Sequence, residues 1–322
     1  ADDLGASFFE VTTALAFHLF AEVPADACVI EVGLGGRLDA TNVLASPAAC
    51  GVAQLGMDHE AFLGNKLAGI AREKAAIAKP GTPILTQRYP AAIARAVADE
   101  AAAREGLCFP QGSAWDIALY RGKVHYRDET GRLDLPEPVL AGAHQLNNMG
   151  LAIAMLRHQD RLAVSDAALR AAPHWAHWPA RLQRLDVGPL LARFPAERPV
   201  WLDGGHNPAA ASALAAHFAK ILAPGERLSV IIGMLANKDA AGFLAPLWPL
   251  IGALHSVPVA GHAHHDGALF AALAAEQGIV HEHHSSLAQA VEAIAANDAP
   301  VLMTGSLYLA GEVLDANGQA PV

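Results

Sequence analysis

Residues 29–42 read VIEVGLGGRLDATN, a short apolar run that carries one glutamate and is followed by three glycines within four positions. An apolar run of this length predicts a buried strand, and the glycines predict a turn whose backbone approaches a ligand closely. In open parallel sheets, ligands bind beyond the carboxyl ends of the strands. This stretch therefore predicts a nucleotide-binding α/β fold with Glu31 at the edge where the ligand lies.

Strands and helices alternate along most of the chain. Apolar runs predict further strands over residues 49–55 and 82–86, and apolar periodicity predicts helices over 7–22, 66–78, 90–103 and 145–157. Residues 113–136 alternate polar and apolar side chains, which indicates an antiparallel ribbon. Five more strands are expected in the segments 200–205, 228–234, 254–259, 278–283 and 300–306. The pattern indicates two α/β domains joined by a linker over residues 173–186.

Composition excludes several classes of protein. The chain of 322 residues is 53% hydrophobic and carries a net charge of −10, which argues against a nucleic-acid partner. No apolar run approaches the roughly 18 residues of a membrane span, and the first residues lack the pattern of a secretory signal. The three cysteines have no metal-binding spacing, and Cys28 falls in the predicted strand 27–32. A reduced, cytoplasmic setting is expected.

Two common nucleotide motifs do not fit the glycine-rich stretch. The dinucleotide fingerprint G-x-G-x-x-G matches at Gly33 and Gly35, but its third position is Leu38. The phosphate-binding pattern G-x-x-x-x-G-K-[ST] is absent, because the only Gly-Lys pair, Gly122-Lys123, is followed by Val124. A dinucleotide-dependent oxidoreductase is therefore disfavoured, and a metal site at the strand ends becomes the better interpretation of this stretch.

A magnesium site is one interpretation of the strand ends. Glu31 ends one predicted strand, and Asp58 and His59 end the next, so neighbouring strands would each offer a metal ligand. Mg²⁺ is bound by one or two carboxylates together with phosphate and water. The alternatives are a solvated glutamate beside a glycine turn and a histidine with a structural role.

Lys74 lies on the apolar face of the predicted helix 66–78. Its helical neighbours are Ile70, Ala71, Ile77 and Ala78. Its aliphatic stem could pack there with the amine in water. Alternatively, burial deprives the amine of water and favours its neutral form, which adds CO₂ to give a carbamate able to hold a metal ion.

Eight ordered sequence blocks carry a family resemblance: EVGLGGRLDATN, GMDHEAFLG, IAREKAAIAKPG, LAGAHQLNN, WPARLQ, LDGGHNPAA, GMLANKD and TGSLYLAGEV. Together they resemble the folylpolyglutamate synthase/dihydrofolate synthase family of the Mur ligase group. The resemblance implies a P-loop-NTPase-like parallel-sheet ATPase domain over residues 1–172, N-terminally incomplete. It also implies the linker 173–186 and a Rossmann-like α/β domain over 187–322.

The resemblance also implies a reaction and its ligands. ATP would phosphorylate a carboxylate of dihydropteroate or a reduced folate, and L-glutamate would attack the acyl phosphate to form an amide. Glu31 corresponds to a ligand of nucleotide-bound Mg²⁺, and His59 and Lys74, as its carbamate, correspond to a second Mg²⁺ site. Asn148 corresponds to an ATP-contacting residue. A monovalent cation and a monomeric state are further expectations.

The remaining matched residues lie in the glycine-rich block and towards the C-terminus. Arg181 corresponds to the linker arginine that reaches the phosphates, although Ala180 stands where the family motif usually has glycine. Asp203 and His206 correspond to nucleotide and reaction-centre residues. Arg181, Asp203 and Ser306 each have a purely structural alternative. These are a linker ion pair for Arg181, a strand-end cap for Asp203 and a helix cap for Ser306. The expected substrate-side residues are Arg37, Asp39, Asn42 and Ser306.

Three alternatives remain open. The family's phosphate loop precedes the region matching Ser7 and is missing here, so an inactive, truncated form of the folate enzyme is one of them. Another Mur-group amide ligase is the second. The histidine-rich segments 261–267 and 281–285 raise a metal site as the third, although surface histidines are the interpretation that their sequence favours.

Overall fold

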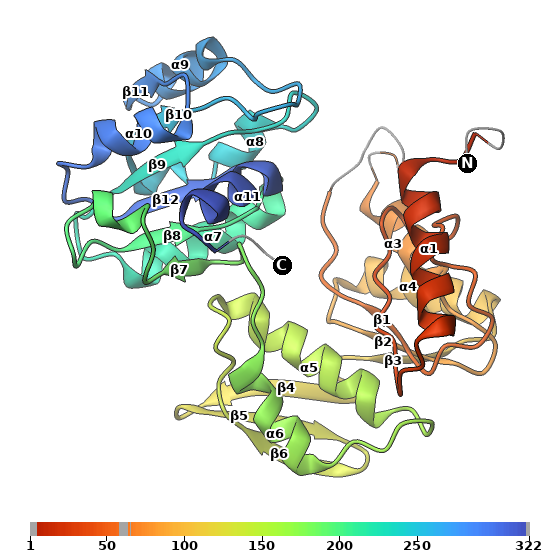
Figure 1. The fold of residues 1–322 in the computed structure, drawn as a ribbon. Helices are drawn as coiled ribbons and strands as arrows, with labels where there is room; N and C mark the ends of the chain where they lie inside the picture. Colours follow the sequence, from red (N-terminus) through yellow and green to blue (C-terminus); the bar gives the residue numbers. More distant parts are fainter. Residues whose placement is uncertain (1–4, 58–63, 65, 320–322) are drawn as a thin grey trace. The chain divides into compact units, whose positions relative to one another are not determined.

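The computed structural model describes residues 5–57, 64 and 66–319. The chain divides into two compact units: unit 1 comprises Ala1–Pro138 and Leu146–Trp175, and unit 2 comprises Val139–Gln145 and Ala176–Val322 (Figure 1). The chain therefore passes between the units more than once. The linker predicted over 173–186 begins in the last turn of one helix and extends past a short strand.

Unit 1 contains a three-stranded parallel sheet of order β1-β2-β3. The strands are β1 (Cys50–Val52), β2 (Pro83–Thr86) and β3 (Leu107–Pro110), and two helices follow them in the predicted places, α3 (Leu67–Ala75) and α4 (Ala91–Ala103). Both helices bury alanines against the sheet, which lets backbone approach backbone closely. The alternation of strands and helices predicted from the sequence is confirmed in this part of unit 1.

The strand predicted over residues 27–32 is wrong. These residues form no helix or strand, and no described strand pairs with them; Val29 is 97% exposed and Cys28 is exposed as well. A strand forms only where a neighbour accepts and donates its backbone hydrogen bonds. An apolar pattern alone does not supply that neighbour.

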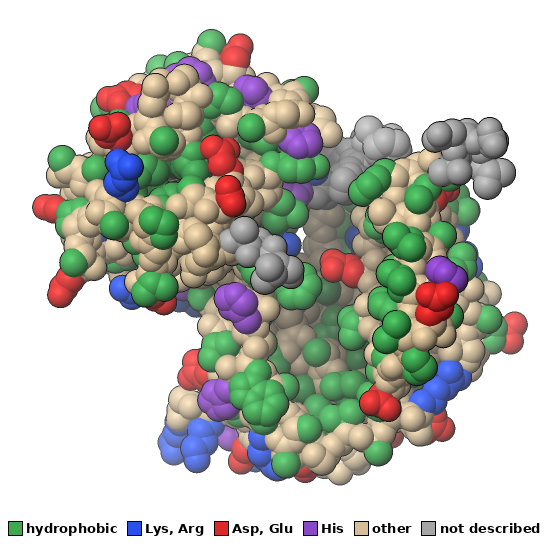
Figure 2. Space-filling view, in the orientation of Figure 1, with side chains coloured by type: hydrophobic (Ala, Val, Ile, Leu, Met, Phe, Trp, Pro, Cys, Tyr) green, Lys and Arg blue, Asp and Glu red, His purple; other side chains and the backbone are tan. Residues whose placement is uncertain are grey.

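Helix α1 (Phe8–Glu22) begins at a capping box formed by Ser7 and Glu10. The Glu10 N–H donates to Ser7 Oγ at 3.3 Å, and the Ser7 N–H donates to Glu10 Oε2 at 2.7 Å. No residue of the helix is buried, although the helix is rich in apolar residues. Figure 2 shows hydrophobic side chains along this helix. Phe8 and Leu15 are among its exposed apolar residues.

The ribbon predicted over 113–136 is a three-stranded antiparallel sheet. Its strands are β4 (Trp115–Tyr120), β5 (Lys123–Asp128) and β6 (Gly131–Leu135), with β5 in the centre. Helices α5 (Ala143–Arg157) and α6 (Asp166–Trp175) follow it in the chain. Trp115, Tyr126 and Leu133 are fully buried in the core that this sheet shares with both helices.

Unit 2 contains a six-stranded sheet of order β11-β10-β9-β12-β8-β7. Five strands are parallel and match the predicted segments: β8 (Val200–Leu202), β9 (Leu228–Ile232), β10 (Ile251–Ser256), β11 (Val280–His283) and β12 (Val301–Thr304). The sixth, β7 (Gln183–Leu185), is an antiparallel edge strand that the sequence did not predict. A strand of three residues is too short to show an alternation of polar and apolar side chains.

Helices cover both faces of this sheet. One face packs against α7 (Pro208–Ile221), α8 (Ala240–Leu244) and α9 (Gly267–Glu276), and the other against α10 (Leu287–Ile294) and α11 (Leu307–Ala316). Successive strand residues alternate between the two cores, as Val230 and Ile231 do. Two short 3₁₀ helices, η2 (Leu191–Arg193) and η3 (Trp248–Leu250), lie in the connections. Among the described residues, no helix has both the length and the apolar character that crossing a bilayer requires.

Candidate active site

In unit 2 the carboxyl end of β8 carries a buried carboxylate, Asp203. Its Oδ2 accepts the N–H of Leu182 at 2.8 Å, and its Oδ1 accepts the N–H of Gly205 at 2.7 Å. Burial raises the pKa of Asp203, while the two backbone N–H groups and nearby Arg181 act in the opposite direction. Asp203 therefore fixes the backbone at Leu182, just before β7, and at Gly205, just after β8.

Arg181 lies between two residues in the left-handed region. Ala180 has φ +54° and Leu182 has φ +46°, conformations that non-glycine residues adopt rarely. Hydrogen bonds hold this turn: the Ala180 N–H donates to Gln183 Oε1, and the Gly204 N–H donates to the Ala180 carbonyl, both at 2.9 Å. Glycine, which the family resemblance implies at position 180, would adopt this conformation without steric cost.

His144 faces the same group, and the sequence analysis missed it. Burial lowers the pKa of His144; the Asp203 carboxylate acts to raise it and the Arg181 guanidinium to lower it further. Both charges thus lie close to the imidazole. The signal in the sequence was the block LAGAHQLNN, of which only Asn148 was assigned a role.

The loops after β8 and β12 contact each other. The Gly305 N–H donates to the Gly205 carbonyl at 3.1 Å. Gly305 has φ +112°, and a Cβ there would lie 2.8 Å from the Gly233 carbonyl, so only glycine fits. His206 Nδ1 lies 3.2 Å from the Gly204 carbonyl oxygen. His206 and Asp203 therefore share one loop.

Ser306 is the N-cap of α11. Its Oγ accepts the Leu309 N–H at 3.0 Å, and the residue is only 3% exposed. The helix-cap alternative for Ser306 is thus the role that its contacts support.

In unit 1 the Asp39 carboxylate organises the glycine-rich loop. Its Oδ2 accepts the N–H groups of Gly33 and Leu34 at 3.0 and 2.8 Å, and its Oδ1 accepts the Thr41 N–H and hydroxyl at 2.9 and 2.5 Å. Burial alone would raise the pKa of Asp39, but these hydrogen bonds outweigh it and hold the pKa below its ordinary value. With four donors on two oxygens, Asp39 shapes the loop.

This loop packs on the last turn of α3, next to Lys74. The Arg37 N–H donates to the Glu73 carbonyl at 3.0 Å, and Arg37 Nε donates to Glu73 Oε1 at 2.9 Å. A Cβ on Gly36 would lie 2.5 Å from the Glu73 carbonyl oxygen and 3.1 Å from Lys74 Cα. The observed close approach of the Gly36 backbone is to helix α3, whereas the predicted approach of this loop to a ligand stays a prediction.

Asn42 closes the same loop from its other end. Its Nδ2 donates to the Arg37 carbonyl at 3.1 Å, and Lys79 Nζ donates to Asn42 Oδ1 at 2.7 Å. Sequence reasoning missed Glu73 and Lys79, because a partner's identity depends on tertiary contact. Arg37, Asp39 and Asn42 thus each have a protein partner.

The three expected metal-site residues differ in how well the structure places them. Lys74 is half-buried beside buried Ile70 and Ala71, and its amine makes no hydrogen bond or ion pair with a described residue. Glu31 is exposed and is likewise unpaired within the described part of the chain. His59 lies outside the described residues. Neither the Lys74 nor the Glu31 side chain therefore has a polar partner among the described residues, and the metal-site roles stay predictions.

Asn148 belongs to a group of side-chain amides near the carboxyl ends of β2 and β3. Gln87 Nε2 donates to Asn148 Oδ1 at 3.0 Å, and Gln111 Nε2 donates to Asn147 Oδ1 at 3.1 Å. A cavity of about 370 Å³ lies beside them. Its lining comprises Gln54, Gln87, Arg88, Gln111, Asp116, Ile117, Ala118 and Asn147. The two glutamines were missed because single amides give no sequence period.

Comparison with known proteins places these features in a family. Residues 191–307 match the family described as Mur ligase, glutamate ligase domain. A folylpolyglutamate synthase of Lacticaseibacillus casei is 31% identical over 97% of this chain and 71% of its own length. The chain belongs to the folylpolyglutamate synthase/dihydrofolate synthase family. A second relative, the dihydrofolate synthase/folylpolyglutamate synthase of Escherichia coli K12, is 32% identical over 97% of this chain and 70% of its own.

Solved structures of this family resemble the chain throughout. E. coli FolC in complex with DHPP and ADP superposes with a TM-score of 0.84 at 30% identity, over 96% of this chain and 70% of that one. A bifunctional folylpolyglutamate synthase/dihydrofolate synthase with Mn, AMPPNP and L-glutamate bound gives a TM-score of 0.82 at 27% identity. The similarity covers 97% of this chain and 71% of that one. The α/β Mur ligase fold expected from the sequence is therefore confirmed.

Proposed function

We propose that this protein is an ATP-dependent ligase that adds L-glutamate to dihydropteroate, to reduced folates, or to both. The observation that carries the proposal is similarity over 97% of the chain to enzymes with these names. Structural neighbours bind ADP with DHPP, and AMPPNP with L-glutamate. The reaction joins two anions through an acyl phosphate, so it requires cationic groups that offset their repulsion.

Unit 1 supplies the metal-binding part of the proposal. The exposed Glu31 carboxylate would hold nucleotide-bound Mg²⁺, and Lys74, as its carbamate, would hold a second divalent ion together with His59. Bound Mg²⁺ neutralises phosphate charge and polarises the γ-phosphoryl group. Asp39 does not fit as a metal ligand, because its oxygens already accept four hydrogen bonds. Asn148 would contact ATP.

Unit 2 supplies charge and positioning. Arg181 would bind phosphate oxygens, and the turn that fixes its backbone reduces the conformational freedom that it would lose. Asp203 orders that turn through the Leu182 N–H and electrostatically balances Arg181 and His144. His206 would contact the nucleotide from the same loop.

The expected substrate-side residues take supporting roles in this proposal. Arg37, Asp39 and Asn42 hold the glycine-rich loop against α3, and Ser306 caps α11. Their side chains therefore shape the surfaces that substrates meet. The protein would act as a cytoplasmic monomer, with residues 1–172 as ATPase domain and 187–322 as C-terminal domain. A monovalent cation at the metal site belongs to the same proposal.

The decisive experiment measures phosphate release from ATP by the purified protein. Release that depends on both L-glutamate and dihydropteroate, or on L-glutamate and tetrahydrofolate, is the expected result. Release with a nucleotide-linked muramoyl substrate instead would identify another Mur-group ligase. Failure to bind ATP in calorimetry would identify the inactive form, since the 322 residues contain no G-x-x-x-x-G-K-[ST] pattern.

A further inference from the structure

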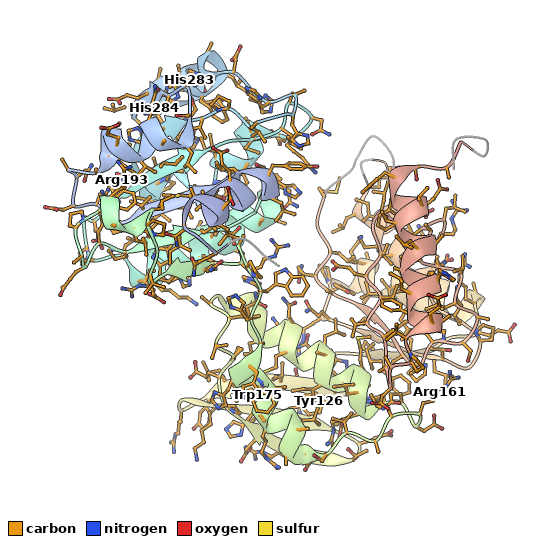
Figure 3. The ribbon with its side chains drawn as sticks, in the orientation of Figure 1. Tyr126, Arg161, Trp175, Arg193, His283 and His284 are labelled. Carbon is orange, nitrogen blue, oxygen red and sulfur yellow. The ribbon has the colours of Figure 1, made fainter. Side chains whose placement is uncertain are left out.

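The histidine-rich segment 281–285 divides between the two faces of the sheet in unit 2. In the parallel register, His255 of β10 lies beside Glu282 of β11, and Ser256 lies beside His283. Because strand side chains alternate, His255, Glu282 and His284 face the α10 side. His281 and His283 face the opposite side, where each has a ring nitrogen 2.9 Å from Ser256 Oγ. Figure 3 labels His283 and His284 at the end of β11.

The three residues on the α10 side bring their ligand atoms together. His255 Nδ1 lies 3.0 Å from His284 Nε2, and Glu282 Oε2 lies 4.0 and 3.8 Å from these two nitrogens. All three atoms lie within 4.8 Å of one another. Ligands at 2.0–2.1 Å from a tetrahedral zinc are about 3.3 Å apart, so small side-chain movements produce that geometry.

The protonation states of the two histidines also suit a cation. Burial lowers the pKa of His255, and His284 lowers it further; burial lowers the pKa of His284 as well. Both shifts favour the neutral imidazole, whose ring nitrogen keeps a lone pair. Arg198 opposes a cation here, whereas the Glu282 carboxylate favours one. Glu282 is 57% exposed in its side chain, which leaves the remaining coordination position to water.

We infer that His255, Glu282 and His284 form a binding site for a divalent first-row metal ion of the zinc class. The ligand set of two imidazoles and one carboxylate is one that zinc accepts. The ion joins two neighbouring strands, because His255 belongs to β10, and Glu282 and His284 belong to edge strand β11 and the residue after it. Metal binding thereby stabilises the edge of the unit 2 sheet.

The sequence of residues 281–285 favoured surface histidines and not a metal site, because one of the three inferred ligands lies outside this segment. The third ligand, His255, comes from another strand and is 7% exposed. The other histidine-rich segment does not form such a group: His265 Nε2 lies 2.7 Å from the Lys238 carbonyl oxygen, and His262 stacks against Tyr308.

The test is a titration of chelator-treated protein with Zn²⁺, followed by calorimetry, and with Co²⁺, followed by its visible absorption. The parent should bind one equivalent, and the spectrum should be that of a tetrahedral or five-coordinate cobalt ion. His284→Gln and Glu282→Gln should each weaken binding at least about tenfold. The Glu282 side chain is 57% exposed, so Glu282→Gln should fold and keeps the test decisive should His284→Gln be unstable.

His281→Gln is the matched control, because it removes a histidine from the same strand on the opposite face. It should bind Zn²⁺ as the parent does, and in both proteins Zn²⁺ should raise the midpoint of thermal unfolding. Equal affinity in all four proteins would mean that surface histidines bind the ion unspecifically. That result, or no saturable binding by the parent, would overturn the inference.

Discussion

The turn around Arg181 concentrates backbone strain in two neighbouring residues. A left-handed conformation costs an L-residue roughly 1–2 kcal/mol, and both Ala180 and Leu182 adopt it. The hydrogen bonds from Leu182 to Asp203 and from Gly204 to Ala180 hold the turn despite that cost. The position of Arg181 is thus set by backbone contacts as much as by its own side chain.

Ala180→Val should destabilise the protein by about 2 kcal/mol or more. A β-branched side chain in the left-handed region is a steric outlier, and the site is buried, so there is no space for relief. Ala180→Gly should change stability by less than about 1 kcal/mol, because relief of strain offsets the lost methyl group and the greater unfolded-state entropy. Chemical denaturation measures both. Equal effects of the two substitutions would contradict the strained conformation.

Lys74→Ala should lower kcat for glutamate-dependent phosphate release by at least about 100-fold, because a metal-binding carbamate would be lost. Small carboxylates such as acetate should restore part of the rate. Lys66→Ala, at the exposed N-cap of the same helix, is the control and should retain the parent rate. A Lys74→Ala variant with normal turnover would refute the carbamate role.

At the level of elements, the contact between the glycine-rich loop and α3 depends on Gly36. Gly36→Ala should destabilise the protein by about 1–3 kcal/mol, because its Cβ would meet the Glu73 carbonyl oxygen at 2.5 Å. It should also raise KM for ATP. Gly311→Ala is the matched control: it lies within α11 with open space around it, and should stabilise by about 0.5–1 kcal/mol. Destabilisation by both substitutions would contradict the packing argument.

A paired carboxylate joins β5 to the end of α5. Arg157 Nε and Nη2 donate to the two oxygens of Asp128 at 2.6 and 3.0 Å, and Thr130 donates as well. Burial would raise the pKa of Asp128, but these hydrogen bonds prevail and lower it to about 2. The charged carboxylate therefore stabilises the fold above pH 3.8, its ordinary pKa. This contribution is lost as the pH falls from there to about 2.

Asp128→Asn should consequently cost roughly 1–2 kcal/mol at pH 7, after allowance for solvent screening. Its free energy of unfolding should fall less than that of the parent between pH 4 and pH 2. Urea unfolding at a series of pH values measures the difference. Parallel curves for the two proteins would show that the pair does not contribute to acid sensitivity.

For the molecule as a whole, the sequence predicted most elements that have a clear period. Helices α3 and α4, the antiparallel ribbon and five parallel strands of unit 2 were all expected. Residues 27–32 were the main error, because the apolar pattern does not report whether a neighbouring strand exists. The β7 edge strand was too short to recognise.

The structure brings some of the predicted site residues together, and the roles assigned to them stay predictions. Asp203 and Arg181 lie close together, and Glu31 and Lys74 have no polar partner among the described residues. Asp39 and Ser306 proved to be bound to backbone, which no spacing reveals. His144 and Glu73 were missed, because their significance lies in tertiary neighbours distant in the sequence.

The division of the chain has a consequence for any attempt to dissect it. Helix α5 starts in unit 2 and continues into unit 1, so neither unit corresponds to one uninterrupted stretch of the polypeptide. A gene fragment that starts at residue 176 would encode Asp203 without His144, and the carboxylate would lose an electrostatic neighbour. The two units therefore alternate along the sequence, and cutting the chain at residue 176 separates Asp203 from His144.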